Sequence, residues 1–257
     1  MKIGVSTFYG INNKSILESV EELEKAGFDT IELMYEFDNL IKPEEISQLK
    51  RKKLDFSMHC PFIGVMFTHL NPAFSIPQVK MIEESLEAAH KIGCSHYVMH
   101  GGLVPSVYLM IENQKTRDFF VELFIQRFSE IFKNYSNYGM KILMENLGSH
   151  RNIGGELNDI FKIKKAIPQL GFCFDIAHAE ITKETNEIFD KLKIDYVHAT
   201  DNNSIEDEHK VIGNGKINYK EIVNKLKDKG FDGKIILENL SFTECVDSYK
   251  NLKKLMK

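Results

Sequence analysis

The chain has 257 residues, of which 43% are hydrophobic and 27% are charged, and 33 basic against 37 acidic side chains give a formal net charge of −4. This composition is typical of a globular protein and excludes the disordered and fibrous classes. The mildly acidic balance weakly disfavours a nucleic-acid binder, because it provides no general field that attracts phosphate.

Short apolar segments alternate along the whole chain with longer segments of helical period. Eight short segments are predicted strands, at residues 2–7, 28–33, 54–59, 95–100, 141–146, 171–175, 194–199 and 234–239. Helices are predicted between them at residues 15–26, 43–52, 77–92, 112–138 and 218–229, with a closing helix after Phe242. Gly27, Gly93 and Gly230 are suited to end helices, while Pro43 and Pro77 are suited to first helical turns.

The number of these units predicts the fold. Eight strand–helix units in 257 residues give about 32 residues per unit, which is typical of a (β/α)8 barrel. We therefore predict an α/β protein with a single TIM barrel domain over residues 1–257. The alternative is a doubly wound open sheet, which often carries a glycine-rich motif after its first strand, whereas the segment here is STFYGIN.

Ligand-type side chains stand at seven predicted strand ends, where barrel enzymes place their active sites. They are Glu32, His59, His100, Glu145, Asp175, His198 and Glu238, and His178 follows Asp175 by one helical turn. A single such residue is more often a solvated rim residue or a helix cap. A glutamate inside apolar strands such as ILMEN and IILEN, however, needs a compensating charge. Together the residues predict a site for a divalent metal ion.

Three local patterns near these strand ends each have two interpretations. Asp207 and His209 face the same way if their segment is extended, but the acidic run 206–208 is also typical of a solvated loop. The glycines of His100-Gly101-Gly102 clear space above a ligand or simply make a turn. The turn Gly213-Asn214-Gly215 can hold an anion on its amides or serve as an ordinary loop.

Membrane and redox signals point to the cytoplasm. No run approaches the about 18 apolar residues of a spanning helix, and MKIGVSTFYG contains no apolar signal region. The four cysteines, Cys60, Cys94, Cys173 and Cys245, form no C-x-x-C pair. We expect reduced, mostly buried thiols in a cytoplasmic protein with no membrane segment.

The motif series SMHCPF, YVMHGG, LMENLG, FDIAHA, VHATDN, DEHKVIGNG and ILEN resembles the xylose isomerase-like TIM barrel superfamily. This superfamily includes sugar and sugar-phosphate isomerases and epimerases, and also endonuclease IV. For the isomerase and epimerase branch, the resemblance implies one divalent ion (Zn, Mn, Mg or Co) held by Glu145, Asp175, His198 and Glu238. It gives Glu145 and Glu238 the acid and base roles and places His178 near the substrate, while the cation stabilises enediolate oxygens.

For endonuclease IV, the same resemblance implies nine ligands for up to three zinc ions. They are His59, His100 and Glu145 for the first ion, Asp175, His198 and Glu238 with bridging Glu145 for the second, and His178, Asp207 and His209 for the third. Sites that hold several metal ions suit phosphodiester hydrolysis, because the ions stabilise both the attacking and the leaving oxygen. The chain departs from this branch at Glu208, where an arginine is usual, and it has only four arginines to contact DNA.

Three functional hypotheses follow. The first is a metal-dependent isomerase or epimerase that acts on a small sugar or sugar phosphate. The second is a trinuclear zinc phosphodiesterase acting on abasic-site DNA, with Phe62, Ile63 and Tyr35 as candidate wedges, although core or rim packing is the better explanation for each. The third is a barrel that binds metal and ligand without catalysis. The sequence leaves the metal, the particular sugar and the oligomeric state open.

Overall fold

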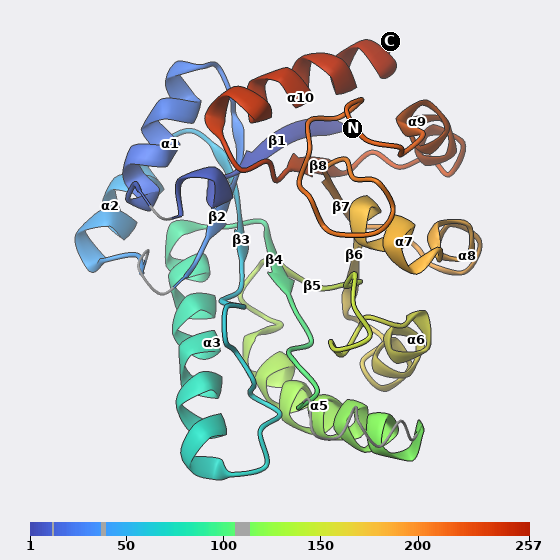
Figure 1. The fold of residues 1–257 in the computed structure, drawn as a ribbon. Coiled ribbons are helices and arrows are strands. Elements are labelled where there is room, and N and C mark those ends of the chain that lie inside the picture. Colours follow the sequence, from blue (N-terminus) through green and yellow to red (C-terminus); the bar gives the residue numbers. More distant parts are fainter. Residues whose placement is uncertain (12, 37–39, 106–113) are drawn as a thin grey trace.

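The computed structural model of the chain describes residues 1–11, 13–36, 40–105 and 114–257. Within these residues eight parallel strands form a closed barrel, in which each strand pairs with the next and β8 pairs with β1 (Figure 1). The strands are β1 Lys2–Ser6, β2 Thr30–Met34, β3 Asp55–His59, β4 His96–Met99, β5 Lys141–Glu145, β6 Gly171–Asp175, β7 Tyr196–Ala199 and β8 Lys234–Leu237. The predicted (β/α)8 barrel is confirmed.

Helices surround the barrel (Figure 1). They are η1 Thr7–Gly10, α1 Ile16–Lys25, α2 Pro43–Arg51, α3 Pro72–Ile92, α5 Gln114–Tyr135, α6 Leu157–Ala166, α7 Ile176–Thr182, α8 Thr185–Lys191, α9 Tyr219–Asp228 and α10 Phe242–Leu255. Several begin at side-chain caps, because the first backbone amides of a helix need acceptors. Ser15, for example, forms a capping box with Glu18, and Ser241 caps the Glu244 amide.

The helix predictions are right in type and differ at some ends. The prediction that Pro77 lies in a first turn is wrong, because α3 already begins at Pro72, with Asn71 accepting the Ala73 amide. An earlier cap and an earlier proline therefore start this helix, and Pro77 lies inside it. Residue 112, the predicted start of the next helix, lies outside the described residues. Helices α6, α7 and α8 are additional to the predicted ones.

Side chains alternate between the inside and the outside of the barrel, as strand geometry requires. One inner layer is a buried cluster of Val98, Leu143, Cys173, Tyr196 and Ile236. Two residues further along the same five strands stand His100, Glu145, Asp175, His198 and Glu238. The period of two thus carries these polar side chains to the next layer, at the carboxyl ends of the strands.

Apolar packing between barrel and helices makes the main core. From α5, for example, Phe120, Phe124 and Phe128 are all fully buried. At the amino-terminal end of the barrel, the Lys234 ammonium lies 2.6 Å from Asp55 and 2.7 Å from Ser95. The four cysteines are free and buried, as expected. No helix of the described residues is both long enough and apolar enough to cross a bilayer.

Candidate metal centre

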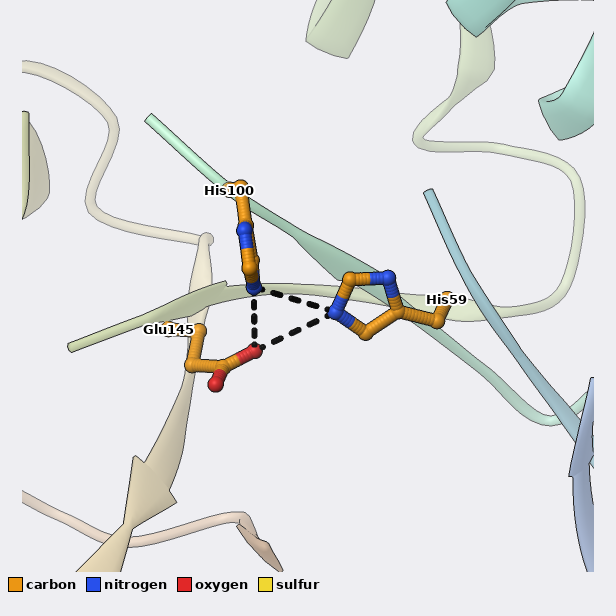
Figure 2. A group of neighbouring side chains, drawn as sticks. All are labelled: His59, His100 and Glu145. Atoms are coloured by element: carbon orange, nitrogen blue, oxygen red, sulfur yellow. Dashed lines mark hydrogen bonds and ion pairs between the residues drawn. The ribbon is translucent and has the colours of Figure 1, made fainter. Parts of the chain in front are cut away.

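His59, His100 and Glu145 converge from the ends of β3, β4 and β5 (Figure 2). The Nε2 atoms of the two imidazoles lie 3.1 Å apart, and Glu145 Oε2 lies 3.4 Å from His59 Nε2 and 3.1 Å from His100 Nε2. His59 donates its Nδ1–H to the carbonyl of Cys60 at 2.7 Å, which orients Nε2 toward the group. Two imidazole nitrogens and a carboxylate oxygen in one small space form a donor set suited to a divalent ion.

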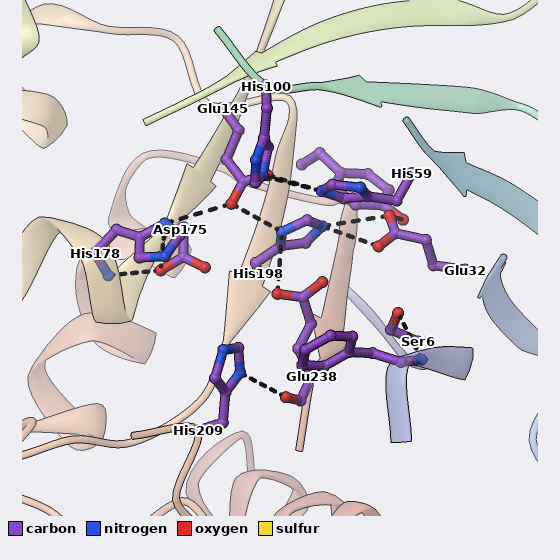
Figure 3. A network of polar contacts seen from close by, with 12 residues as sticks. Ser6, Glu32, His59, His100, Glu145, Asp175, His178, His198, His209 and Glu238 are labelled. Carbon is purple, nitrogen blue, oxygen red and sulfur yellow. Dashed lines mark hydrogen bonds and ion pairs between the residues drawn. The ribbon is translucent and has the colours of Figure 1, made fainter. Parts of the chain in front are cut away.

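His198 lies at the centre of the polar network and is fully buried (Figure 3). Its Nδ1 lies 3.3 Å from Glu145 Oε1 and 3.4 Å from Glu238 Oε2. Within the described part of the chain this buried nitrogen makes no hydrogen bond. An unpaired buried nitrogen is costly, so its position between two carboxylates fits a bound cation that the nitrogen would ligate.

Asp175 and His178 lie at the junction of β6 and α7. The Asp175 carboxylate caps α7 by accepting the His178 amide at 2.7 Å. The His178 ring donates Nδ1–H to the carbonyl of Asn146 at 3.0 Å, and Glu145 Oε1 lies 3.5 Å from the same nitrogen. The ligating atoms of Glu145, Asp175 and His178 all lie within 4.8 Å of one another.

Asp207 and His209 complete the set of predicted residues. Asp207 Oδ2 lies 3.1 Å from His178 Nε2 and 3.0 Å from His209 Nε2, so this carboxylate joins the two imidazoles. His209 donates Nδ1–H to the carbonyl of Glu238 at 2.7 Å and has a φ of 48°. A non-glycine residue in this left-handed region is uncommon and is typical of functional sites.

Electrostatic interactions shift the pKa values of these groups strongly. Burial alone would lower the pKa of His198, but Cys173 and the nearby carboxylates outweigh burial and raise it well above its usual value. Burial disfavours ionised Glu145, yet the imidazoles around it hold its pKa well below the usual range. Burial is the main cause that raises the pKa of Glu238 to about 7. The carboxylates therefore favour positive charge within the cluster, which a metal ion would supply while displacing protons.

The cluster opens into a cavity of about 340 Å³, a size typical of small-molecule sites. Its polar lining consists of His59, His100, Glu145, Asn152, His178, Asp207, His209 and Glu238. Its apolar lining includes Phe8, Phe62 and Leu147. The Phe62 ring contacts the rings of His59 and His100, with centroids 5.4 and 5.2 Å apart. The cavity lining thus combines charged, ligand-type side chains with apolar side chains.

Comparisons with known proteins agree with this architecture. Residues 20–254 match the family described as xylose isomerase-like TIM barrel. The chain belongs to this family. An uncharacterized protein of Methanocaldococcus jannaschii is 31% identical over 268 aligned residues, which cover 100% of this chain and 89% of that protein. The resemblance inferred from the motifs is therefore confirmed.

Two further comparisons found relatives with names of two different kinds. A crystal structure of a D-tagatose 3-epimerase-like protein has a TM-score of 0.89 and 30% identity, and the match covers 100% of this chain and 97% of that one. A probable endonuclease 4 of Mycobacterium leprae is 25% identical over 194 residues, 71% of this chain and 72% of the relative. An epimerase-like protein and a probable endonuclease thus both resemble this chain.

The structure brings all nine predicted ligand residues into one connected network and adds Glu32 to it. Glu32 is fully buried, and its carboxylate contacts the second nitrogen of His198 at 3.2 Å. Its place at a strand end had put it among the ligand-type residues that predicted a metal site, but the resemblance gave it no role. Two asparagines had no place in the predicted site. Each follows a glutamate in the repeated dipeptide Glu-Asn, at Glu145-Asn146 and Glu238-Asn239.

These two asparagines fix the backbone of neighbouring site residues. Asn146 accepts the Asp175 amide at 2.8 Å and donates to the Asp175 carbonyl at 2.9 Å. Asn239 donates to the carbonyls of His209 and Lys210 at 3.0 and 2.9 Å. Because successive strand residues face opposite sides, each glutamate points into the barrel while the next residue braces an adjacent segment. The repeated dipeptide was the signal that could have identified them.

The structure also bears on two other predictions, the candidate wedge residues and the turn at residues 213–215. Tyr35 is buried, so it is no exposed wedge, whereas Ile63 is exposed and Phe62 lines the cavity. In the turn at 213–215, the Gly213 amide donates to the Asp201 carboxylate at 2.8 Å. That amide therefore already has an internal anionic partner, and the ordinary-loop interpretation of this turn is favoured.

Proposed function

We propose that this chain is a divalent-metal-dependent isomerase or epimerase that acts on a small sugar or sugar phosphate. The observation that carries the proposal is the placement of Glu145 and Glu238, which come from β5 and the end of β8, line one cavity and approach the same His198 nitrogen. Moving a proton between neighbouring carbons of a hydroxy-ketone needs two such groups acting on different faces of the substrate.

Glu145, Asp175, His198 and Glu238 would hold the cation. Their oxygen and imidazole donors suit Mn, Mg, Co or Zn, and the unpaired Nδ1 of His198 supports the fit. A bound divalent cation supplies positive charge that stabilises oxygen atoms as negative charge develops on them. The buried position of these residues keeps bulk water away from that charge.

The chain's own groups would move the proton. One carboxylate, Glu145 or Glu238, removes a proton from the carbon beside a carbonyl, and the other delivers a proton to the opposite face. His178, held by the Asn146 carbonyl, presents Nε2 at the cavity as a hydrogen-bonding partner for a substrate oxygen. A cavity of about 340 Å³ supports a substrate the size of a monosaccharide.

A second candidate, a zinc phosphodiesterase of the endonuclease 4 type, is favoured by the joining of His178 and His209 through Asp207. In that function the two imidazoles and Asp207 would hold a third ion. The chain has only four arginines available for DNA phosphates, and one of them, Arg117, is buried in a protein ion pair. We therefore rank this function second.

Metal content and activity, measured on the same preparation, test the proposal. Elemental mass spectrometry of the wild type and of His209→Ala is combined with assays on a panel of ketoses, their phosphates and abasic-site DNA. About one ion per chain, unchanged in the variant, together with turnover of a ketose or ketose phosphate supports the isomerase. Three zinc ions that fall to two in the variant, with cleavage of abasic-site DNA, would reject it in favour of the phosphodiesterase.

Variants of the two carboxylates sharpen the test. Glu145→Gln and Glu238→Gln should each lower kcat by about 100-fold or more, because each removes a proton-transfer group. Glu87→Gln, on the exposed surface of α3, is the matched control and should retain wild-type kcat. Wild-type kcat in both site variants would contradict the proposed roles.

A further inference from the structure

Glu32 is a carboxylate inside the barrel, next to the candidate metal centre. It comes from β2, its side chain is fully buried, and it is not among the residues that line the cavity. Glu32 Oε1 and Oε2 lie 3.2 and 3.3 Å from His198 Nε2 (Figure 3). The Tyr196 hydroxyl donates to Glu32 Oε2 at 2.9 Å. A buried carboxylate with these two partners occupies a fixed position.

A second contact holds Tyr196 in turn. The hydroxyl groups of Ser57 and Tyr196 lie 2.5 Å apart, and both side chains are fully buried. Glu32 and Ser57 are paired neighbours in the register of β2 and β3. A short chain of hydrogen bonds therefore runs from Ser57 through Tyr196 to Glu32 and ends on the imidazole of His198.

An ionised carboxylate only accepts hydrogen bonds, so the His198 nitrogen that faces Glu32 must carry a proton. A neutral imidazole has one N–H, and if that proton is on Nε2, then Nδ1 carries the lone pair. Nδ1 is the atom that lies between Glu145 and Glu238 and has no hydrogen-bond partner within the described part of the chain. The carboxylate thus selects the tautomer that a cation on the cavity side requires.

We infer that Glu32 is a positioning residue that, with Tyr196, fixes the tautomer and ring orientation of His198 for a divalent cation held on the Nδ1 side. The inference rests on the metal site of the proposed function. Three other site histidines donate Nδ1–H to backbone carbonyls, those of Cys60, Asn146 and Glu238. His198 has a carboxylate in this place, and a carboxylate accepts a stronger hydrogen bond and increases the basicity of the ligating nitrogen.

The competing role for Glu32 is that of a metal ligand. Ligating atoms of Glu32, His198 and Glu238 do lie within 4.8 Å of one another. The carboxylate, however, contacts Nε2, whereas Glu145 and Glu238 contact Nδ1, which is on the other side of the ring. Its Oε2 atom also receives the Tyr196 hydroxyl and the His198 ring. These contacts favour the positioning role, and the two roles differ in measurable ways.

The decisive variant is Glu32→Gln, which keeps the side-chain volume and an oxygen for the Tyr196 hydroxyl. Its amide can donate to His198 Nε2, which would move the imidazole proton to Nδ1 and block the ligating atom. Calorimetric titration of chelator-treated protein with Mn²⁺, and separately with Zn²⁺, measures affinity and stoichiometry. We expect affinity about 10–100-fold weaker than in the wild type with unchanged stoichiometry. Loss of one bound ion would instead make Glu32 a ligand, and unchanged affinity would overturn the inference.

Two control variants separate positioning from a general loss of stability. Tyr196→Phe retains the Glu32–His198 contact, so its metal affinity should fall less than that of Glu32→Gln. Asp55→Asn removes a carboxylate at the opposite end of the barrel, where Lys234 and Ser95 contact it. It should leave metal affinity unchanged. Equal weakening in all three variants would reduce the role of Glu32 to fold maintenance and overturn the inference.

A measurement on the wild type alone keeps the inference testable if the variants fail to fold. Nitrogen-15 NMR of the zinc-loaded, histidine-labelled protein should find a proton on His198 Nε2 and the metal on Nδ1. Metal on Nε2 would overturn the inference. Failure of the proposed function looks different, because there the wild type would turn over no ketose or ketose phosphate while Glu32→Gln still weakened metal binding.

Discussion

The Nε2 atoms of His59 and His100 lie 3.1 Å apart. Neither imidazole carries a negative charge that would balance a positive charge on the other. Burial lowers the pKa of His100 to about 4, so this ring is neutral near pH 7. Since His59 Nδ1 is engaged by the Cys60 carbonyl, its Nε2 faces His100 across a space that also contains a Glu145 oxygen. Two imidazole nitrogens and a carboxylate oxygen in this space form a donor set for a divalent ion.

Metal removal and restoration should therefore change stability. For protein treated with a chelator, free Zn²⁺ or Mn²⁺ at 100 times its dissociation constant should raise the free energy of unfolding by about 2.7 kcal/mol for each occupied site. Urea unfolding at several metal concentrations measures this. His198→Ala should reduce the gain, because His198 belongs to the proposed metal site, and His90→Ala, an exposed histidine on α3, is the matched control. The same gain in both variants would exclude His198 as a ligand.

Arg117 and Asp159 form a buried ion pair behind the cavity wall, and its disruption should be costly. The guanidinium contacts both Asp159 oxygens, at 3.2 and 2.5 Å, and donates to the carbonyls of His150 and Asn152. Asp159 is fully buried and also accepts the Gly154 amide at 3.0 Å. Arg117→Ala leaves this carboxylate without its cation and should lower the free energy of unfolding by about 3–5 kcal/mol.

Urea unfolding of three variants tests this ion pair. Arg117→Lys keeps the charge but lacks the forked geometry, so its loss should be intermediate. Arg151→Ala removes an exposed arginine nearby and should change the free energy of unfolding by less than about 0.5 kcal/mol. Similar values for Arg117→Ala and Arg151→Ala would show that the buried pair contributes no special stability.

The sequence predicted the barrel because eight repeats of a strand pattern leave few alternatives. It predicted that the ligand-type side chains cluster because the strand ends meet at one face. Seven strand ends with ligand-type residues were enough to find the cluster without side-chain coordinates. What the pattern could not contain is the direction of each ring nitrogen. His198 turns Nε2 to Glu32, which is distant in sequence and adjacent in space, and turns Nδ1 to Glu145 and Glu238.

Helix boundaries show the same limit on a smaller scale. Pro43 starts α2 as expected, but Pro77 lies inside α3 because Asn71 and Pro72 start that helix earlier. Pro72 and Pro77, five positions apart, give two possible starts, and the sequence alone ranks them only by local preference. The bracing role of Asn146 likewise required the position of Asp175 on the next strand. Contacts beyond the local pattern determine the start of α3 and the role of Asn146, whereas local patterns were enough for the other predicted helices and strands that the structure confirms.

Gly101 follows His100 and should tolerate no side chain. A Cβ at this position would overlap the carbonyl of Ile153, which belongs to the loop after β5. Since that loop is held by backbone bonds to Gly102 and Val104, it has little freedom to move away. Gly101→Ala should lower the free energy of unfolding by about 1–3 kcal/mol and weaken metal binding by displacing His100. Urea unfolding and calorimetric metal titration measure the two effects, and wild-type values in both would contradict the overlap.

His96 should make stability depend on pH in the acid range. Burial, reinforced by the nearby Lys234 ammonium, lowers the pKa of His96 to about 4 from an ordinary value of 6.5. Between these values the unfolded chain binds a proton that the folded protein does not, so stability falls as the pH decreases from about 6.5 to about 4. His96→Gln removes this contribution, and the free energy of unfolding should fall less steeply over that range than in the wild type. Urea unfolding at several pH values on metal-free protein measures both slopes, and equal slopes would show that His96 titrates alike in the folded and unfolded chains.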